Sequence, residues 1–362
     1  MTENIVEIFD VEDYKRLVEN HYLDDAKIIE KKDSEVLIEY RFEPRSEKYA
    51  PIIAFRRLPI FNSSEFLEND SENIFYINSK FVTSDEIEKC LDKLDKEKHR
   101  AIIQCAFFED DVNFSGVVFD DNSRFIGSRF GDRTNFSKTE FGDGTIFYVC
   151  KFGNGTNFYN AQFSDSALFK KNEFGDGTLF NTSSFGNIVD FTSSKFKDGT
   201  SFEYITFNGD AIFSRTEFGN LASFKHSVFN KQARFKETSF RGMTNFTETA
   251  FKGETTFFDE SFDLKRGLDE GEGKNIIINQ EIIDFSDSQF FTKSKISARY
   301  KILIMRDVII RDVVSVAEFL KIDLTRITIL GHLNIAGKNY MRKRIYSKNG
   351  KIQISLISWN IF

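Results

Sequence analysis

Side chains that could carry catalysis are few in this chain, and their spacing forms no known reaction centre. The four histidines, His21, His99, His226 and His332, have no partner at the spacing of a metal site or a catalytic triad. His226 falls at an expected outward corner and should face solvent, and we expect the same of His21 and His99 in their polar contexts. The sequence therefore predicts a protein that is not an enzyme, with no catalytic residue, no cofactor and no small-molecule substrate.

Short segments rich in glycine and aspartate could suggest a phosphate or calcium site. They read Gly-Asp-Gly at 142–144 and 175–177 and Gly-Asn-Gly at 153–155. A phosphate-binding loop needs a helix after its glycines, and no helix is expected here. Glycine-rich calcium repeats have a different period, and Asp143, Asn154, Asp165 and Asp176 should fall on different faces. We expect no metal site, and we interpret these segments as corners that need positive φ.

The three cysteines indicate a reducing compartment. Cys90, Cys105 and Cys150 are odd in number and have no metal-like pairing, and packing explains Cys150 at an expected inward position. The N-terminus has no basic segment followed by an apolar stretch, so we expect no signal peptide. The longest apolar run, 302–305, falls far short of the roughly 20 residues of a spanning helix. These features predict a cytoplasmic protein with no transmembrane segment.

Phenylalanine organises the middle of the sequence. Two interleaved ladders, each in steps of eleven, run from Phe108 to Phe262 and from Phe114 to Phe257, so the gaps alternate between six and five residues. This spacing fits neither a helix nor a strand, but a fixed short period is typical of a solenoid, whose repeats bury their apolar sides by stacking. The predicted structural core includes Phe108, Phe119, Phe130, Phe141, Phe152, Phe163, Phe174, Phe185, Phe114, Phe125, Phe136, Phe147, Phe158, Phe169 and Phe180.

A small residue stands two positions before nearly every ladder phenylalanine. It is Ala, Ser, Thr, Val or Cys in 26 of 29 cases, and the exceptions are Asn172, Ile205 and Glu260. Positions i−2 and i of an extended segment point to the same side. Each unit should therefore send one ring and one small side chain inward before the chain turns a corner.

These small–x–Phe–x–x units resemble pentapeptide repeats, in the Phe-rich variant in which five- and six-residue units alternate. The segments TNFSKTEF at 134–141 and AIFSRTEF at 211–218 carry the resemblance, which covers roughly 106–263. It implies an all-β solenoid, a right-handed quadrilateral β-helix with four units and about 22 residues per coil. Because leucine is commoner at the central position in the wider family, the resemblance also implies a wide core filled by aromatic rings.

The charged residues give a separate indication of a 22-residue coil. The residue before the ring is charged at every second step of the ladder, at Arg129, Lys151, Glu173, Lys195 and Glu217. The intervening set has one charge and consists of Val118, Glu140, Gln162, Ser184, Thr206 and Val228. A coil of 22 residues puts the two sets on different faces. We predict a column of charges about 4.8 Å apart, worth on the order of a few tenths of a kcal/mol per exposed pair.

The sequence divides into five segments. Residues 1–105 predict a small α+β domain that caps the first coil, with a helix start at 11–18, a strand at 35–42 and a helix from an N-cap at Ser84 to about Arg100. Residues 106–263 form the predicted β-helix, 264–282 an irregular excursion, 283–336 tapering terminal coils and 337–362 a basic C-terminal tail.

The ladder resumes beyond the excursion with smaller side chains. Phe285, Phe290 and Ile296 come first, and a second set again steps by five and six: Val308, Val313, Phe319, Leu324, Leu330 and Ile335. We expect about two further coils with an aliphatic core. The segment 317–327 is similar to the closing coils of pentapeptide-repeat proteins.

Without a reaction centre, we expect function to be a property of the surface. We predict a bacterial interaction or scaffold protein that presents a rigid β-helical surface to a protein partner of unknown identity, and a homodimer is left open. The resemblance implies an alternative, a DNA mimic that binds a topoisomerase. Residues 106–263 would form a rod on the order of 34 Å long, over which duplex DNA carries about 20 negative charges. Their 16 basic and 22 acidic residues leave a net charge of −6, which favours the scaffold.

The C-terminal tail is the basic part of the chain. Residues 264–362 hold 17 basic and 10 acidic residues, a net of +7, against −8 for residues 1–105. Nucleic acid or an anionic membrane surface could bind there, although a solvated pair of terminal strands explains the charges equally well. The candidate contacts to an anionic partner are Lys338, Arg342, Lys343, Arg344, Lys348 and Lys351.

Overall fold

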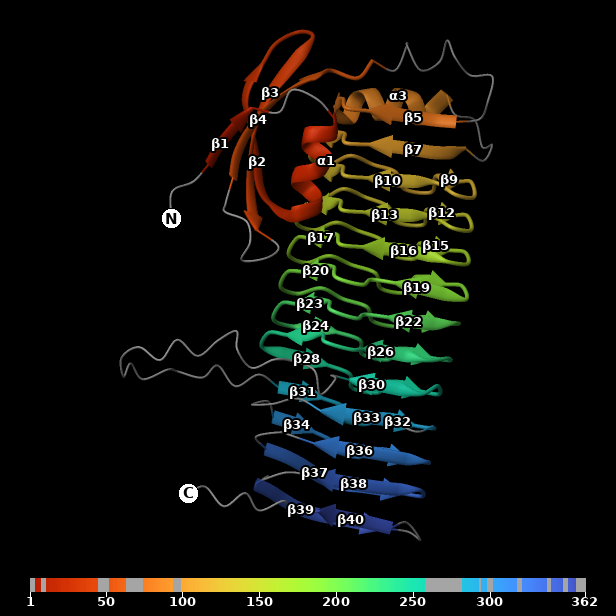
Figure 1. Ribbon diagram of the computed structural model, residues 1–362. Helices are drawn as coiled ribbons and strands as arrows, with labels where there is room; N and C mark the ends of the chain where they lie inside the picture. Colours follow the sequence, from red (N-terminus) through yellow and green to blue (C-terminus); the bar gives the residue numbers. More distant parts are fainter. Residues whose placement is uncertain are drawn as a thin grey trace, which may run out of the picture. The chain divides into compact units, whose positions relative to one another are not determined.

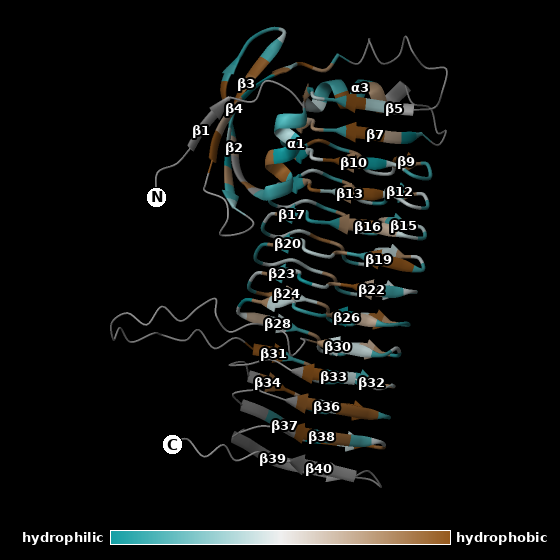
Figure 2. Ribbon diagram, viewed as in Figure 1, coloured by the Kyte–Doolittle hydropathy of each residue, from teal (hydrophilic) through white to brown (hydrophobic). Residues whose placement is uncertain are grey.

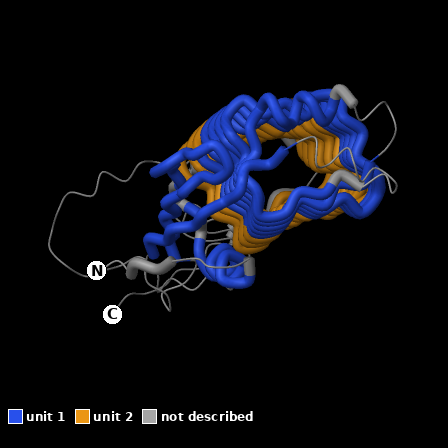
Figure 3. Tube along the Cα trace, turned by 90° about the horizontal axis from the view of Figure 1, so that it is seen from above, with its two compact units in different colours: residues 1–186, 194–197 blue, residues 187–193, 198–362 orange. Residues whose placement is uncertain are grey.

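The computed structural model describes residues 4–7, 11–44, 52–62, 74–93, 99–257, 282–292, 294–297, 302–317, 321–336, 340–347 and 351–355. The chain forms two compact units, 1–186 with 194–197 and 187–193 with 198–362 (Figure 3). Each unit contains parallel β-coils, most of them with a repeat of about 22 residues, so the fold is the expected β-solenoid. The two units are described in turn.

Short parallel strands form three faces of the coils in the first unit (Figure 1). The first face has β5 (Ile74–Asn78), β7 (Arg100–Gln104), β10 (Arg124–Ile126), β13 (Ile146–Tyr148) and β16 (Ala167–Lys170). The second has β6 (Phe81–Val82), β8 (Phe107–Phe108), β11 (Arg129–Phe130), β14 (Lys151–Phe152), β17 (Glu173–Phe174) and β20 (Lys195–Phe196). The third has β9 (Val118–Phe119), β12 (Glu140–Phe141), β15 (Gln162–Phe163) and β18 (Ser184–Phe185). Single bridges that join Asn113, Asn135, Asn157 and Leu179 complete a fourth face.

The strand register confirms the 22-residue coil. Phe130 pairs with Phe152, and Phe152 with Phe174. The strand spacing of about 4.8 Å stacks their rings nearly parallel, and Phe152 and Phe174 have centroids 4.7 Å apart and planes 2° apart. Rings in adjacent columns meet edge to face, as Phe152 and Phe158 do at 5.7 Å and 72°. All the rings named above as the predicted core are at most 3% exposed.

The small inward residues also hold the backbone of neighbouring coils. Thr139 Oγ1 donates a hydrogen bond to the carbonyl oxygen of Phe114 at 2.8 Å. Asn172 takes the same place in a later coil, where its Nδ2 donates to Phe147 O at 2.8 Å and its Oδ1 accepts from Cys150 N at 2.8 Å. Because a buried polar group needs a partner, these positions select small residues that pack tightly or donate inward.

The N-terminal subdomain, which we define as residues 4–59, packs against the side of the first coils. It contains β1 (Asn4–Glu7), α1 (Val11–Asn20), β2 (His21–Lys31), β3 (Glu35–Pro44) and β4 (Ile52–Pro59), with a sheet in the order β1-β4-β3-β2. Tyr14 of α1 and Tyr40 of β3 share a buried cluster with Phe107 and Val149 of the coils. A Cβ added at Gly127 would lie 3.7 Å from Val18 Cγ2 of α1. The subdomain therefore shares one apolar core with the flank of the solenoid.

A second helix, α3 (Ser84–Lys93), follows β6. Its N-cap is Thr83 and not Ser84, because Thr83 Oγ1 accepts the N–H of Glu86 at 3.3 Å while Ser84 Oγ donates to Asp110 O at 2.8 Å. The sequence predicts that this helix continues to about Arg100. It does not, because Arg100 is the first residue of strand β7. The strands β5 and β7 pair in register with each other, and β7 pairs with β10, so this sheet begins within residues 74–104. The five segment boundaries given above stay a prediction.

The second unit continues the same pattern of short parallel strands. One sheet contains β19 (Ile188–Asp190), β22 (Asp210–Ile212), β26 (Ala233–Phe235), β30 (Thr255–Phe257), β33 (Ser294–Ser297), β36 (Val313–Ala317), β38 (His332–Ala336) and β40 (Lys351–Ser355). A second contains β23 (Glu217–Phe218) and β27 (Ser239–Phe240). The third comprises β21 (Thr206–Phe207), β25 (Val228–Phe229), β29 (Ala250–Phe251), β32 (Gln289–Phe290), β35 (Ile309–Ile310), β24 (Ala222–Ser223), β28 (Met243–Asn245), β31 (Ile282–Asp284), β34 (Ile302–Ile304), β37 (Lys321–Ile329) and β39 (Tyr340–Ser347).

The coils shorten where aliphatic residues replace the rings. Phe290 pairs with Ile310, and Ile310 pairs with Ile329, so both steps along the sequence are shorter than the step from Phe130 to Phe152. Smaller side chains fill a narrower coil, which needs less chain to close. The hydropathy colours of β36 and β38 show this apolar section (Figure 2).

The prediction of which residues point inward in these last coils is therefore partly wrong. Val308 and Ile335 are buried as expected, but Val314 and Val316 are buried in place of Val313. Leu330 is exposed, and Ile327 and Ile329 are buried before it. The shorter coil shifts the inward positions away from a strict alternation of five and six.

Three further expectations concern residues or side chains that the structure does not describe. They are the last ring of the first ladder, Phe262, the side chains of Phe319 and Leu324, and most of the excursion at 264–282. Phe251 pairs with Phe290 across that gap in the sequence. In the described part of the chain, neither helix has the length and apolar character to cross a bilayer.

Candidate functional site

A row of charged side chains follows the second face of the first unit. It contains Arg129, Lys151, Glu173 and Lys195, each one residue before a core ring and in register with the next. Lys151 Nζ lies 3.5 Å from Glu173 Oε2, and Lys195 Nζ lies 3.6 Å from Glu173 Oε1. These contacts follow the charge column expected from the sequence. The expectation of exposed pairs is wrong for Glu173, which is only 5% exposed.

The N-terminal subdomain accounts for part of this burial. Lys151 Nζ donates a hydrogen bond to the backbone carbonyl of Leu23 in β2, in addition to its contact with Glu173. One ammonium group therefore joins a strand of the subdomain to the charged row of the coils. Desolvated ion pairs need such additional hydrogen bonds, because the attraction between the charges alone seldom offsets the loss of hydration.

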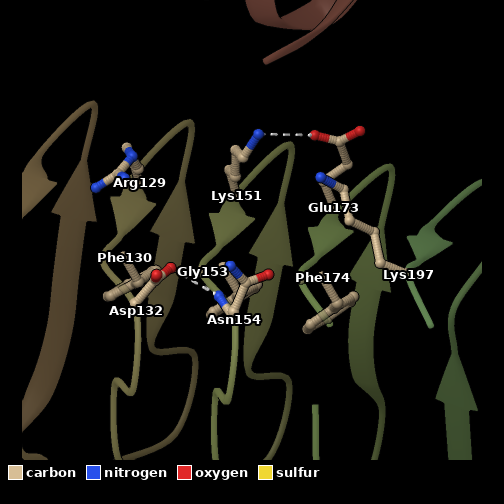
Figure 4. Close-up of a pocket in the computed structure, with 11 residues that line it drawn as sticks. Arg129, Phe130, Asp132, Lys151, Gly153, Asn154, Glu173, Phe174 and Lys197 are labelled. Carbon is tan, nitrogen blue, oxygen red and sulfur yellow. Dashed lines mark hydrogen bonds and ion pairs between the residues drawn. The ribbon is translucent and has the colours of Figure 1, made fainter. Parts of the chain in front are cut away.

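A recess of about 210 Å³ lies along this row. Arg129, Lys151 and Glu173 line it from the strand positions before the rings, and Asp132, Asn154 and Lys197 line it from the following turns (Figure 4).

Gly153 and Gly175 form a further part of the wall, together with Phe130, Phe152 and Phe174. A Cβ added at Gly153 would lie 2.5 Å from Asp132 N, and one at Gly175 would lie 2.6 Å from Asn154 N. Glycine is required at both positions because the preceding coil is too close for a side chain. Lys197 stands one coil further at the same position and carries its side chain to the recess.

The residues that line the recess carry more positive than negative charges. Among the lining residues, three are cationic (Arg129, Lys151 and Lys197) and two are carboxylates (Asp132 and Glu173), a net of +1. The Arg129 guanidinium also stacks on the ring of Phe107 at 4.4 Å. Within the described residues, Glu173 Oε2 is buried and accepts no hydrogen bond, since its contact with Lys151 is an ion pair only. A buried acceptor without a hydrogen-bond donor is unfavourable, and the two lysine ammonium groups beside Glu173 offset part of that cost.

The aspartates of the glycine-rich corners have a structural role. Asp132 Oδ1 accepts the N–H of Asn154 at 2.8 Å, and Asn154 Oδ1 accepts the N–H of Asp176 at 2.9 Å. Asp143 Oδ1 accepts the N–H of Asp165 in the same way at 2.9 Å. Positive φ occurs in these turns, as expected, for example +67° at Gly144. No group of three metal-ligating side chains occurs in the described ranges.

The structure changes the interpretation of two of the histidines. His21 and His99 are buried, so the expectation that they face solvent is wrong. The His21 ring packs edge to face against Phe42, with ring centroids 6.3 Å apart. The backbone of His99 forms an isolated parallel β-bridge with that of Phe119. His226 lies at a corner with φ of 58°, where it stacks on Tyr204 at 4.6 Å and its Nδ1 lies 2.9 Å from Glu248 Oε2.

All three cysteines are buried, and none of them is in a disulfide. Burial raises the pKa of the Cys150 thiol to about 12 and also raises the pKa of Cys105 above its ordinary value. Cys150 Sγ donates to Phe125 O at 3.1 Å, so it acts as one more inward donor in the column of small residues. A neutral, buried thiol is a poor nucleophile.

The predicted contacts to an anionic partner lie mostly on the last two strands. Arg342, Lys343 and Arg344 belong to β39, and Lys351 begins β40. Lys338 and Lys348 lie outside the described residues. Asp323 of β37 pairs in register with Arg342. The binding of an anion at this tail stays a prediction.

The comparisons with known proteins agree with this architecture. The fold places the chain in the class of parallel β-solenoids with stacked columns of phenylalanine rings. Residues 213–261 match a family model described as pentapeptide repeats, with nine copies. This match and the regular spacing of the phenylalanine ladder fit a Phe-rich pentapeptide-repeat protein. No curated protein and no solved structure matches it.

Sequence reasoning found the charged row but missed the recess. The contact between Lys151 and the Leu23 carbonyl joins residues 128 positions apart, which no local pattern indicates. One signal was present in the sequence. Gly131, Gly153 and Gly175 follow each other at steps of 22, and the next member of that series is Lys197.

Proposed function

We propose that the protein is a non-enzymatic interaction scaffold that presents the outer faces of its coils to a protein partner. One observation carries the proposal. The inward residues of each coil are committed to ring stacking and backbone hydrogen bonds, so that side chains on regular, flat outer rows are left for recognition. Repeat solenoids commonly use such extended surfaces for binding. The three buried cysteines, none of which is in a disulfide, support a reducing compartment such as the cytoplasm.

The test is capture of a partner by the immobilised full chain from a native lysate, followed by reconstitution with the purified partner. We expect a stoichiometric protein complex and no hydrolase, transferase or nuclease turnover by the purified chain. Turnover by the purified chain would refute the proposal. Capture of a topoisomerase, together with inhibition of supercoiling, would favour the DNA-mimic alternative instead.

Single substitutions on different outer faces can locate the surface that is used. Arg124, Glu140, Tyr159 and Lys195 each lie on a different face of the first unit. If one face binds, Arg124→Glu, Glu140→Lys, Tyr159→Ser and Lys195→Gln should affect binding of the reconstituted partner unequally. An equal effect of all four, with unchanged thermal unfolding, would argue against a specific face.

A further inference from the structure

We propose that the first face of the first unit binds an amphipathic helix of a partner protein, with an acidic residue at the centre of the apolar side of that helix. The proposal deepens the proposed function, on which it rests, because it names the face and the chemistry of the partner. It uses three properties of the face: an apolar outer column, a single cation within that column, and the spacing of the coils.

The outer positions of this face are mostly apolar. In the sheet of β5, β7, β10, β13 and β16 (Figure 1), the residue before each buried position points outward, in register with the next coil. The column so formed, which we call the apolar stripe, consists of Tyr76, Ile102, Arg124, Ile146 and Leu168.

The equivalent columns of the other three faces are mostly polar or charged. Each has a single apolar member, Phe107 on the second face, Val118 on the third and Leu179 on the fourth. The remaining members are Arg129, Lys151, Glu173 and Lys195, then Glu140, Gln162 and Ser184, and then Asn113, Asn135 and Asn157. The apolar stripe therefore distinguishes one face of the unit from the rest.

The side chains of the stripe are accessible. Tyr76 is 52% exposed, Arg124 is also exposed, and Ile102, Ile146 and Leu168 are partly buried between their neighbours in the column. Among the described residues, the buried cluster that attaches the N-terminal subdomain to the coils includes none of these five. A contiguous accessible row of apolar side chains is typical of a surface that binds another protein.

The charge of Arg124 selects the partner. Arg124 is the middle member of the stripe, and its neighbours in the column are Ile102 and Ile146. Within the described residues, its guanidinium forms no hydrogen bond or ion pair. A partner that covers the stripe removes water from this cation, so it must supply a carboxylate in return, which a guanidinium can bind through two parallel hydrogen bonds.

A second copy of the chain does not meet this requirement. A two-fold axis through the centre of the stripe would place the Arg124 guanidinium of one protomer against the same group of the other. Like charges brought together in this way oppose association. Moving the axis along the column separates the two charges, but it leaves fewer apolar residues in contact.

The spacing of the coils favours a helix over an extended segment. Neighbouring members of the stripe lie about 4.8 Å apart along the coil axis, so the five members span about 19 Å. Residues at steps of three and four along an α-helix share one side of it and rise about 4.5 and 6.0 Å, a mean of about 5.2 Å. Alternate residues of an extended strand lie about 6.6 Å apart and fall out of step with the coils. A helix of about 13 residues therefore covers the stripe.

Fluorescence polarisation of labelled helical peptides on the full chain tests the proposal. The probe is a fluorescein-labelled peptide of about 18 residues, long enough to form a helix, built from alanine, glutamine and lysine. Its apolar side carries four leucines and one central glutamate, and a second peptide has lysine in place of that glutamate. We expect the glutamate peptide to bind at least about tenfold more tightly than the lysine peptide.

Variants of the chain locate the binding on the stripe. Arg124→Glu should weaken the glutamate peptide at least about tenfold and strengthen the lysine peptide by a similar factor, because it reverses the charge pair. Ile146→Ser should weaken both peptides, because it removes an apolar contact. Lys138→Glu changes the charge equally at an exposed position beyond the fourth face, so it is the matched control and should alter neither. Thermal unfolding of each variant shows whether it remains folded.

Several outcomes would overturn the inference. They are equal binding of the two peptides, no binding of either at about 1 mM, and glutamate-peptide binding that Arg124→Glu does not alter. Self-association of the chain that Ile146→Ser abolishes would assign the stripe to a second copy instead. If the partner captured from a lysate still binds the Arg124→Glu variant with unchanged affinity, the scaffold proposal stands and this inference fails.

Discussion

Lys151 Nζ lies 3.5 Å from Glu173 Oε2, although the two residues are a full coil apart in the sequence. The same ammonium group donates to the Leu23 carbonyl of the N-terminal subdomain. The contacts of the Lys151 side chain therefore depend on three features: the register of the coils, the burial of the charged row and the attachment of the N-terminal subdomain. The predictions below examine these features separately.

The stacked rings should carry much of the stability of the coils. Phe174 lies between Phe152 and Phe196 at 4.7 and 4.5 Å, and Phe174→Ala would leave a cavity among them. We expect a loss of about 3–5 kcal/mol in the free energy of unfolding, measured by chemical denaturation. Tyr159→Ala, on the outer surface, should change it by less than about 0.5 kcal/mol. A loss that small for Phe174→Ala would contradict the inward assignment.

Asn172 should be needed for its hydrogen bonds more than for its volume. Asn172→Leu keeps a similar size but removes the donor to Phe147 O and the acceptor of Cys150 N. We expect this variant to lose about 1–3 kcal/mol of unfolding free energy. Asn172→Ser should lose less, because Ser194 at the equivalent place in the next coil donates to Phe169 O at 2.6 Å. Equal losses for the two variants would mean that packing alone decides this position.

The buried ion pair should show coupling in a double-mutant cycle. Lys151→Met leaves Glu173 with Lys195 as its remaining ion-pair partner among the contacts described here and removes the donor to Leu23 O. We expect a loss of about 1–3 kcal/mol, of which Glu173→Gln in the same chain restores a part. We expect a coupling energy above about 1 kcal/mol, in the upper part of the range for residues in contact.

An exposed pair provides the comparison for that cycle. Lys225 Nζ and Glu248 Oε1 are 3.5 Å apart, and both side chains are solvent-accessible. Their coupling should stay within about 0.2–1 kcal/mol. If the pair of Lys151 and Glu173 shows no more coupling than this exposed pair, burial does not strengthen it.

The sequence predicted those features of the structure that repeat from coil to coil. The period of the rings predicted four columns, and the charges at Lys151, Glu173 and Lys195 predicted their own neighbours, because a solenoid places each residue beside the one a coil later. Contacts that do not repeat were missed. The burial of His21 against Phe42 arises within the subdomain, which has no such period.

The last coils show a second limit of sequence reasoning. The alternation of five and six predicted Leu330 as inward, but the aliphatic core closes the coil earlier, pairs Ile310 with Ile329 and leaves Leu330 exposed. Side-chain volume sets the coil length, and a repeat defined by phenylalanine does not carry over to isoleucine. The recess was likewise missed. Its wall is formed by residues of four consecutive coils, and it includes Lys197, which stands where the earlier coils have a glycine.

Cys150 should make stability depend on alkaline pH. Its pKa is raised from 9.0 to about 12 in the folded chain by burial, so the unfolded thiol ionises first as the pH rises. The contribution of this group is fully present below pH 9.0 and is lost progressively between 9.0 and about 12. The difference in unfolding free energy between the wild type and Cys150→Ala should therefore be smaller at about pH 10 than at about pH 8. An unchanged difference would contradict the burial of the thiol.

The register of the coil is the central claim, because every surface and site described above depends on which residues it brings together. Ser115 Oγ and Ser137 Oγ lie 3.1 Å apart on neighbouring coils. In a chain whose three native cysteines are replaced, Ser115→Cys with Ser137→Cys should form a disulfide on mild oxidation, since neighbouring strands place Cα atoms about 4.8 Å apart, within disulfide range. Ser115→Cys with Ile126→Cys, half a coil apart, should not. A disulfide in the second pair but not in the first would contradict the 22-residue coil.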